Sequence, residues 1–356
     1  MAKYTLRRLV WIIPVILVVA IITFLLMHAA PGGPWDRDPG RRQVDAQTQK
    51  TLNARFNLDQ SLVQQFISYM MVDVDEGKTP EIGKLDLGIF GTHQIGPKTG
   101  STVTCGALCL NLGPSYRQRG RDVENILLDP TPPGTTFLDS RFGYSIRLGL
   151  IALVFAIAIG IPLGVVSALK QNTWVDYGSM FIGTIGVSVP NFVLGILLIV
   201  LLAVGLHLIP VIPPSWNQAG VWVIPVIVLG FGTLAVTARL TRTSMLEVMR
   251  QDYIRTARAK GLPERTVVIH HMLRNALIPV ATTLGPALAT LITGSFIIET
   301  MFGFPGVGRE YVQSISNRDY SMIMATTLLY AVLIALANLS VDLLYAWLDP
   351  RIKVGE

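Results

Sequence analysis

Apolar residues along this chain are concentrated in six long runs separated by polar or charged segments. An α-helix needs about 20 predominantly apolar residues to cross the hydrocarbon core of a bilayer. Most runs also contain Pro or Gly, which spanning helices tolerate where neighbours satisfy the freed backbone groups. The pattern therefore predicts six membrane-spanning helices, at Leu9–Ala29, Leu148–Leu169, Tyr177–Leu208, Val221–Ala238, Ile278–Ile298 and Met322–Leu348.

Three of the runs carry an irregularity. The third is overlong and broken by Pro190, and the sixth is interrupted by Asp342. The first follows Lys3, Arg7 and Arg8, as in a secretory signal peptide, but it exceeds the usual apolar core of about 7–15 residues. We therefore expect the first run to be retained as a span, with cleavage as the alternative.

Composition agrees with this interpretation. Hydrophobic residues make up 51% of the 356 residues and charged residues only 15%, whereas soluble domains are about 25% charged. Mean hydropathy is +0.50. These values argue against a soluble two-domain enzyme and equally against a disordered chain, which lacks apolar residues.

The few charges predict an orientation. Residues 239–274 hold eight basic and three acidic residues, a charge of +5 out of the chain's +6, whereas residues 31–142 hold 12 basic and 13 acidic residues. Because Lys and Arg near spans stay in the cytoplasm, the basic loop and both termini are expected inside, and the long segment outside. The predicted organisation is an N-terminal tail with the first helix (1–30), an extracytoplasmic segment (31–142), a core of five helices (143–348) with a cytoplasmic loop (239–278), and a cytoplasmic tail (349–356).

The basic loop contains a short predicted helix. Asp252 is a suitable N-cap and Gly261 a suitable C-terminal stop. Tyr253, Ala257 and Gly261 are spaced four apart and so share one face, which is small enough for close approach to another protein. Pro263 begins a second predicted helix that leads to the fifth run, which Pro279 opens. The alternative is a basic amphipathic helix lying on anionic lipid.

Four stretches resemble one known family. They are the start YTLRRLVWIIPVILVVAIITFLLMHAAPG, the loop DYIRTARAKGLPERTVVIHHMLRNALIPV, ETMFGFPGVGREYVQSISNRDY after the fifth run, and the end NLSVDLLYAWLDPRIK. In this order they are similar to the B-type permease subunit of bacterial dipeptide and oligopeptide importers of the ATP-binding-cassette (ABC) class. The resemblance implies an all-α membrane protein with the six-helix type I ABC importer permease fold and a large extracytoplasmic insertion between helices 1 and 2.

The resemblance also implies a function and partners. The chain would form half of a pathway for short peptides in the bacterial inner membrane, beside a second homologous permease subunit, two cytoplasmic ATPase subunits that use ATP and Mg²⁺, an extracytoplasmic solute-binding protein and membrane lipid, and no nucleic acid. Relatives with this pattern also carry nickel, haem or oligosaccharides. The family's coupling helix to the ATPase corresponds to Asp252, Tyr253, Ile254, Arg255, Thr256, Ala257, Arg258, Ala259, Lys260 and Gly261.

The loop departs from the motif of the wider importer class. That motif begins with Glu, where this chain has Arg255, and Gly261 lies 18 residues before Pro279. Both departures are features of the peptide-type subfamily, and they remove any salt bridge that would depend on the missing Glu.

The sequence predicts no enzymatic activity and no bound cofactor for the chain itself. A phosphate-binding loop has the pattern G-x-x-x-x-G-K-S/T. Gly77, Lys78 and Thr79 supply only its end, because position 72 is Val. His270 and His271 are adjacent, whereas a metal pair on one helix face is spaced at i and i+4. ATP hydrolysis is therefore expected in a partner chain.

Polar residues in or near the spans are candidates for the translocation path, because such groups are costly in a membrane and often functional. Pro190, Asn191, Glu299 and Phe302 are the proposed path residues. The alternative for each polar one is hydrogen bonding between helices. An ATP-independent secondary transporter is a rival function, but no inverted repeat typical of that class is evident.

The outer segment contains the only two cysteines. Cys105 and Cys109 fall in a Gly- and Pro-rich insertion at 97–139, and an oxidising compartment favours a disulfide between them. A metal site would need more ligands. Apolar residues at 47–73 have a helix-like spacing, which predicts a helix there. The 97–139 insertion is interpreted either as a partly flexible surface element, or as a contact with the solute-binding protein or a lid over the pore entrance.

Overall fold

The computed structural model describes residues 2–35, 45–56, 58–71, 94–95, 103–104, 114–118, 121–210, 213, 215–292 and 296–348. The chain divides into two compact units. Unit 1 comprises residues 1–12, 143–309 and 332–356, and unit 2 comprises residues 13–142 and 310–331. The helices α1, α5, α13 and α14 contribute residues to both units.

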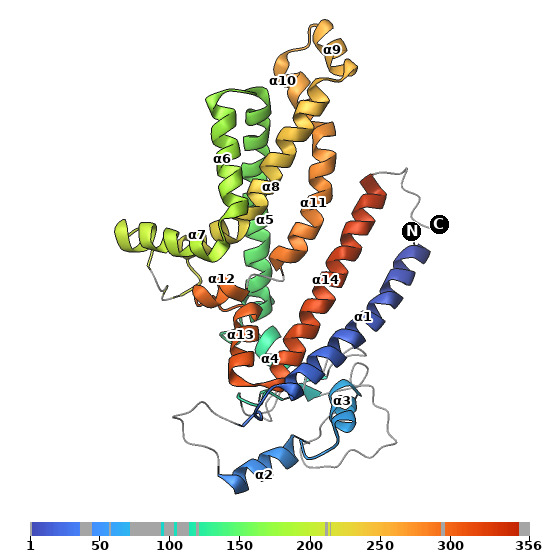
Figure 1. Cartoon of the computed structure of the whole chain (residues 1–356), viewed down its shortest axis with the longest axis vertical. Helices are drawn as coiled ribbons and strands as arrows, with labels where there is room; N and C mark the ends of the chain where they lie inside the picture. Colours follow the sequence, from blue (N-terminus) through green and yellow to red (C-terminus); the bar gives the residue numbers. More distant parts are fainter. Residues whose placement is uncertain are drawn as a thin grey trace. The chain divides into compact units, whose positions relative to one another are not determined.

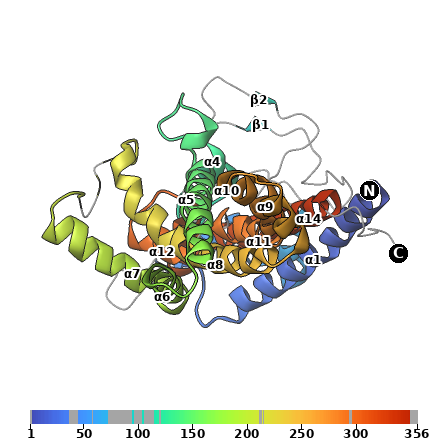
Figure 2. The ribbon, with the colours of Figure 1, turned by 90° about the horizontal axis from the view of Figure 1, so that it is seen from above.

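Unit 1 is helical throughout its described part. Its elements are α5 (Arg141–Leu169), α6 (Trp174–Ser188), α7 (Asn191–Leu198), the π-helix η2 (Ile199–Gly205), the 3-10 helix η3 (Ala219–Trp222), α8 (Val223–Met249), α9 (Asp252–Ala259), α10 (Glu264–Thr266), the π-helix η4 (Val267–Leu273), α11 (Arg274–Ile292), α12 (Phe296–Met301), and parts of α13 (Val307–Asn317) and α14 (Tyr320–Leu348). The helices α5, α6, α8 and α11 pack side by side (Figures 1 and 2).

Each predicted span except the third falls on one long helix or helical stretch, although the helix ends differ. Five helices in the described part of the chain are long and apolar enough to cross a membrane, and a sixth span requires α6 and the α7–η2 helix to act together. These two helices bend by 110° at the break. Pro190 lies at that break as the N-cap of α7, with φ −58°. The third run is therefore a sharply bent pair of helices rather than one overlong helix.

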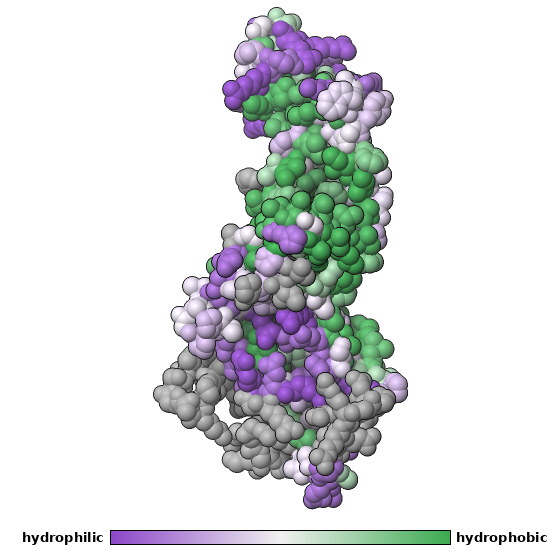
Figure 3. Space-filling model, turned by 90° about the vertical axis from the view of Figure 1, so that its left-hand side faces the viewer, coloured by the Kyte–Doolittle hydropathy of each residue, from purple (hydrophilic) through white to green (hydrophobic). Residues whose placement is uncertain are grey.

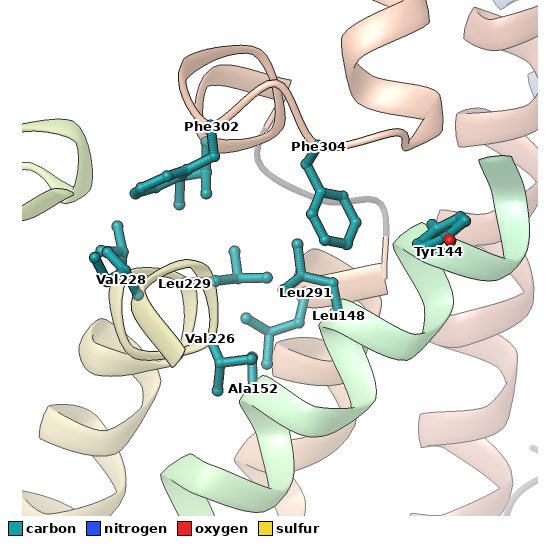
Figure 4. Close-up of a cluster of buried hydrophobic side chains, with 11 residues drawn as sticks. Tyr144, Leu148, Ala152, Val226, Val228, Leu229, Leu291, Phe302 and Phe304 are labelled. Carbon is teal, nitrogen blue, oxygen red and sulfur yellow. The ribbon is translucent and has the colours of Figure 1, made fainter. Parts of the chain in front are cut away.

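Close packing in unit 1 depends on small residues. A Cβ atom at Gly149 of α5 would lie 2.6 Å from the Leu291 carbonyl oxygen of α11, and one at Gly164 would lie 2.5 Å from the Ala238 carbonyl oxygen of α8. In a bilayer the hydrophobic effect does not drive helices together, so they associate through close packing. Small residues allow that close approach. A buried cluster of apolar side chains around the Gly149–Leu291 contact joins α5, α8, α11 and α12 (Figure 4).

Unit 2 contains most of α1 (Ala2–Ala29), α2 (Ala46–Arg55), α3 (Leu62–Met71), the two-residue strands β1 (Gln94–Ile95) and β2 (Val103–Thr104), α4 (Val123–Leu128), the 3-10 helix η1 (Phe137–Asp139), most of α13 and the start of α14. The strands are antiparallel, with Gln94 opposite Thr104. The helix predicted at 47–73 is two helices. Ser61 and Gln64 form a capping box, with the Ser61 N–H donating to the Gln64 side chain at 3.2 Å, and this cap starts α3 as a separate element.

Part of the outer segment is anchored within unit 2. The Asp319 carboxylate, just before α14, accepts from the Ser115 hydroxyl at 2.5 Å and from the Tyr116 N–H at 3.1 Å. The Arg117 guanidinium donates to the Asn317 and Pro34 carbonyl oxygens at 2.6 and 3.0 Å. Burial, and secondarily the Asp319 charge, raise the pKa of Tyr116. Residues 115–117 of the 97–139 insertion are thus held by the segment before α14 and by the Pro34 carbonyl. Cys105 and Cys109, with the disulfide predicted between them, lie outside the described residues.

Candidate functional site: a clamped helix and a cavity lined by Asn191

The short helix predicted in the basic loop is α9, Asp252–Ala259. Its N-cap is Gln251 rather than Asp252, which is the first helical residue, so the predicted cap is displaced by one position. The predicted stop at Gly261 is confirmed, because Gly261 has φ +73°, a left-handed conformation that glycine adopts without steric cost. The helix therefore ends where the sequence indicated.

The apolar face of α9 is used inside the chain. Ile254 and Ala257 are buried at 0% and 6% exposure. They pack against side chains at the end of α5, the end of α8, η4 and the start of α11, namely Ala168, Met245, Val267, Met272 and Ala276. The face predicted to offer Ala257 to another protein is therefore turned inward, while Tyr253 and Gly261 on the same predicted face remain exposed.

Two polar contacts clamp α9 from its sides. The Asn275 amide of α11 donates to the Tyr253 hydroxyl at 2.8 Å. The Arg258 guanidinium donates to both Glu264 carboxylate oxygens, at 2.6 and 3.2 Å, across the turn into α10. Together with the apolar packing, these contacts hold α9 against η4, the end of α8 and the start of α11.

The outer side of α9 is hydrophilic. In Figure 3 the end of the unit that carries α9 and α10 is mostly hydrophilic, and the helices beneath it are mostly hydrophobic. Figure 2 shows α9 and α10 over the ends of α8 and α11. The exposed residues of the predicted coupling element are Asp252, Tyr253, Arg255, Thr256, Arg258, Ala259, Lys260 and Gly261.

The basic loop is shorter than the sequence indicated. Helix α8 continues to Met249, so Arg239 and Arg242 are helical. The Arg242 guanidinium donates to both oxygens of Asp176 in α6, at 2.6 and 2.7 Å. Asp176 also accepts from the Ser167 hydroxyl of α5 at 2.5 Å. The Arg242 charge thus fastens three helices together rather than facing solvent.

The connection from the loop to the fifth span is continuous. Pro263 is the N-cap of α10, so the second predicted helix begins at Glu264. It continues through η4 into α11 without a break, and Pro279 lies inside α11, together with Pro286. The predicted opening of the fifth helix at Pro279 is therefore wrong. Spanning helices tolerate internal proline, and α11 contains two of them.

A cavity of about 320 Å³ lies between α7, α8 and α11. Asn191, the first residue of α7, lines the cavity beside Thr233 and Thr237 of α8 and Thr290 of α11. Four-residue spacing puts Thr233 and Thr237 on one helix face. The remaining lining is Leu229, Gly232, Val236, Thr283, Leu284, Ala287 and Leu291.

Glu299 does not line this cavity but is buried in α12 at 0% exposure. Its carboxylate accepts from the Ser145 hydroxyl at 2.9 Å and from the Arg309 N–H at 3.2 Å, and the Ser145 hydroxyl in turn accepts from the Val307 N–H at 3.0 Å. A Cβ atom at Gly306 would lie only 2.3 Å from the carboxylate. Glu299 therefore holds the turn from α12 to α13 in place.

Phe302 is also a packing residue in the described structure. It is 9% exposed and belongs to the buried cluster shown in Figure 4, in which Phe302 and Phe304 from the turn after α12 point toward side chains of α8, α5 and α11. Of the four predicted path residues, only Asn191 lines this cavity. Pro190 precedes it as the N-cap of α7, and Glu299 and Phe302 lie in the core.

Sequence reasoning did not single out the threonines of the cavity or Asp176. Thr233 and Thr237 carry a recognisable signal, because hydroxyls four residues apart interrupt an otherwise apolar run. Asp176 lies directly before the third predicted run, and its partner Arg242 is 66 residues away, so no local sequence pattern pointed to the pair. Among the described residues, no group of three or more His, Cys, Asp or Glu side chains is arranged to hold a metal ion.

Two family models match the chain. "Binding-protein-dependent transport system inner membrane component" matches residues 160–354, and "Binding-prot-dependent transport system membrane comp, N-term" matches residues 1–137. The first of these alone covers more than half of the chain, and it includes α8, α9 and α11.

Curated relatives match over the full length. The dipeptide transport system permease protein DppB of Bacillus subtilis (strain 168) is 38% identical over 100% of this chain and 99% of its own. The oligopeptide transport system permease protein OppB of Escherichia coli (strain K12) is 34% identical over 99% of this chain and 100% of its own. The glutathione transport system permease protein GsiC of Escherichia coli O1:K1 / APEC is 34% identical over 99% of each chain.

Among solved structures, the inward-facing MetNI methionine ABC transporter matches with 20% identity and a TM-score of 0.49, covering 59% of this chain and 94% of that one. The assignment rests on the family models and on the full-length relatives. The chain belongs to the family of binding-protein-dependent transport system inner membrane components, within the group that includes the dipeptide and oligopeptide ABC transporter permeases.

Proposed function

We propose that this permease forms half of the translocation pathway of an ATP-driven importer for short peptides. The family supplies the permease role, and the peptide substrate is supported by relatives whose names specify dipeptide and oligopeptide transport. The permease spans the bacterial cytoplasmic membrane six times, with α6 and α7–η2 as one bent span. Both termini and α9 face the cytoplasm, in keeping with the positive charge of the α9 region.

The observation that carries the mechanism is that α9 is clamped to the helices that line the cavity. Ile254 and Ala257 of α9 pack on the end of α8 and the start of α11, and α8 and α11 supply ten of the eleven residues that line the cavity. A displacement of α9 is therefore transmitted along both helices to the cavity. Packed cores transmit such displacements because they are dense and resist compression.

We assign α9 and the residues up to Gly261 as the coupling helix that docks on a cytoplasmic ATPase subunit. Its exposed side offers small residues, Thr256, Ala259 and Gly261, between the charged Arg255 and Lys260. ATP and Mg²⁺ are bound by that partner, and closure of the paired ATPases moves α9. A second homologous permease supplies the other half of the pathway, and an extracytoplasmic solute-binding protein delivers the peptide.

The test is a matched pair of variants, Gly261→Trp and Gly261→Ala, in the reconstituted complex. A Cβ atom at Gly261 meets nothing within 4 Å in the described chain, so the position has open space beside it for a docking partner. The φ of +73° strains both variants equally, by about 1–2 kcal/mol. We expect Gly261→Trp to lower peptide transport by about tenfold or more, in the range of coupling free energies between sites, while Gly261→Ala stays close to wild type.

Three outcomes contradict the proposal. Equal transport by Gly261→Trp and wild type removes the docking role of α9. Peptide uptake that continues without ATP, or purification of the permease without any ATPase subunit, favours a secondary transporter instead. Uptake of nickel, haem or an oligosaccharide in place of peptide retains the permease role and changes the substrate.

A further inference from the structure

We propose that the cavity between α7, α8 and α11 is a binding subsite for the main-chain amide groups of a peptide in transit, with Asn191 as its principal ligand. This inference rests on the proposed function and specifies which atoms of the substrate the permease holds. It assigns the threonine hydroxyls of α8 and α11 a supporting role.

Asn191 has an unused side chain in the right place. Its amide lines the cavity, is partly buried, and has no hydrogen-bond partner among the residues that the structure describes. Because the side chain is of intermediate exposure, a molecule that enters the cavity can reach its amide. A polar group within a span is costly unless water or a ligand meets it.

The lining matches a peptide group. Each residue of a peptide offers one N–H donor and one C=O acceptor, and a single Asn side chain offers one acceptor oxygen and two N–H donors. Asn191 is thus able to bind the N–H and the C=O of one extended segment at the same time. Hydroxyls such as those of Thr233 and Thr237 both donate and accept, so they serve the neighbouring peptide groups.

The lining also explains how different side chains are accepted. It contains no Asp, Glu, Lys or Arg among the described residues, so no fixed charge selects for or against a charged peptide side chain. Groups common to all peptides are recognised by Asn191 and the hydroxyls, while the aliphatic residues Leu229, Val236 and Leu284 provide contact without hydrogen-bond requirements. This combination suits broad recognition of peptides of different sequence.

The subsite is connected to the coupling helix. Thr233 and Thr237 lie on α8 and Thr290 lies on α11, the two helices to which α9 is clamped. Asn191 instead belongs to α7, beyond the bend at Pro190. A movement of α8 and α11 that leaves α7 behind separates the hydroxyls from the amide, which would release the peptide.

The experiment compares Asn191→Leu, which keeps a similar volume without an amide, with Asn191→Gln, which restores an amide. Thr184→Val is the control, because Thr184 is exposed on α6, its hydroxyl donates to its own helix at Met180 and it does not line the cavity. Each full complex is reconstituted in liposomes with the same solute-binding protein. Uptake of a tripeptide and of the same tripeptide with N-methylated peptide bonds is measured beside ATP hydrolysis stimulated by the loaded binding protein.

We expect Asn191→Leu to lower tripeptide uptake about tenfold, the effect of one buried polar group left unpaired, with assembly and stimulated ATP hydrolysis retained. Asn191→Gln should recover most of the uptake, and Thr184→Val should match wild type. Wild type should discriminate against the N-methylated tripeptide, and Asn191→Leu should lose that discrimination. Any preference of the binding protein cancels, because both complexes use the same one.

Three results overturn the inference. The first is wild-type uptake and unchanged N-methyl discrimination by Asn191→Leu. The second is failure of Asn191→Leu to assemble with the second permease, which would make the cavity a subunit interface. The third is a wild-type complex that takes up no peptide at all, and this last result alone also removes the proposed function.

Discussion

Two arginine–carboxylate pairs in this permease have the same geometry and opposite surroundings. Arg242 and Asp176 are joined by two hydrogen bonds with a shortest contact of 2.6 Å, and so are Arg258 and Glu264. The side chains of the first pair are 22% and 3% exposed, whereas those of the second are 42% and 57% exposed. The first pair holds α6 and α8 together, and the second closes the turn after α9.

The difference teaches that a charge count does not reveal the role of a charge. Both arginines contribute to the positive segment that predicts the cytoplasmic side. An exposed pair adds little to stability because water and salt screen it, while removal of one member of a buried pair leaves an uncompensated charge. Arg242 is thus part of the fold, and Arg258 is available to a partner through its exposed surface.

The largest expected effect is that of Asp176→Ala. It leaves the Arg242 guanidinium without its carboxylate and also removes the acceptor for the Ser167 hydroxyl. We expect a loss of about 3–5 kcal/mol in the free energy of unfolding, measured by denaturant titration of the purified permease complex. Asp252→Ala is the control, because the Asp252 side chain is 96% exposed and its ion pair with Arg255 is long, at 3.7 Å. Equal stability of the two variants would contradict the structural role of the buried pair.

A third carboxylate, Glu299, sharpens the comparison, because it accepts hydrogen bonds from the Ser145 hydroxyl and the Arg309 backbone N–H rather than from a guanidinium. Gly306→Ala places a Cβ atom 2.3 Å from the Glu299 carboxylate and 2.6 Å from the Ser145 hydroxyl. We expect destabilisation of about 1–3 kcal/mol from overpacking, measured as a lower melting temperature. In Gly178→Ala the new Cβ meets nothing within 4 Å, and replacing a mid-helix glycine should raise the stability of α6 by up to about 1 kcal/mol. A melting temperature that is unchanged in Gly306→Ala would show that the turn after α12 is looser than these contacts indicate.

The smallest expected effect on stability is that of Glu264→Gln. The pair with Arg258 is exposed on both sides, so its loss should cost less than about 1 kcal/mol and fade further at high salt. Unfolding titrations at low and high salt measure this directly. The charge-reversed double variant, Arg258→Glu with Glu264→Arg, should restore the low-salt value. A cost as large as that of Asp176→Ala would remove the distinction between the two pairs.

Much of the fold was predictable because bilayer crossing imposes a strong local constraint. The apolar runs became α1, α5, α8, α11 and α14, and the stop at Gly261 followed from a residue that adopts positive φ. Helix ends were less predictable. Pro279 does not begin α11, since spanning helices accommodate proline through neighbouring groups, and the 47–73 segment is divided by the Ser61 cap.

Some of the candidate functional residues were predictable from a local signal, and others depend on tertiary contacts. Pro190 and Asn191 are marked by a break in an apolar run, which is a local signal. The pairing of Asp176 with Arg242 joins residues 66 positions apart, and the periodicity of neither segment predicts it. Ala257 shows the converse, because its small size at a helix face is equally suited to a partner and to the core, and only packing against Met245 and Met272 settles which.

By itself, the sequence determined that this chain is a membrane protein with six apolar runs and one strongly positive segment, because hydropathy and charge act locally along the chain. Four stretches that resemble the peptide-importer permeases added the family. Tertiary structure decided which charges are buried, that Glu299 and Phe302 belong to the core, and that Asn191 meets the threonines of α8 and α11 at one cavity. The physical reason is that burial and pairing depend on which helix faces meet, and that is fixed by the 110° bend after α6 and the close packing of α5, α8 and α11.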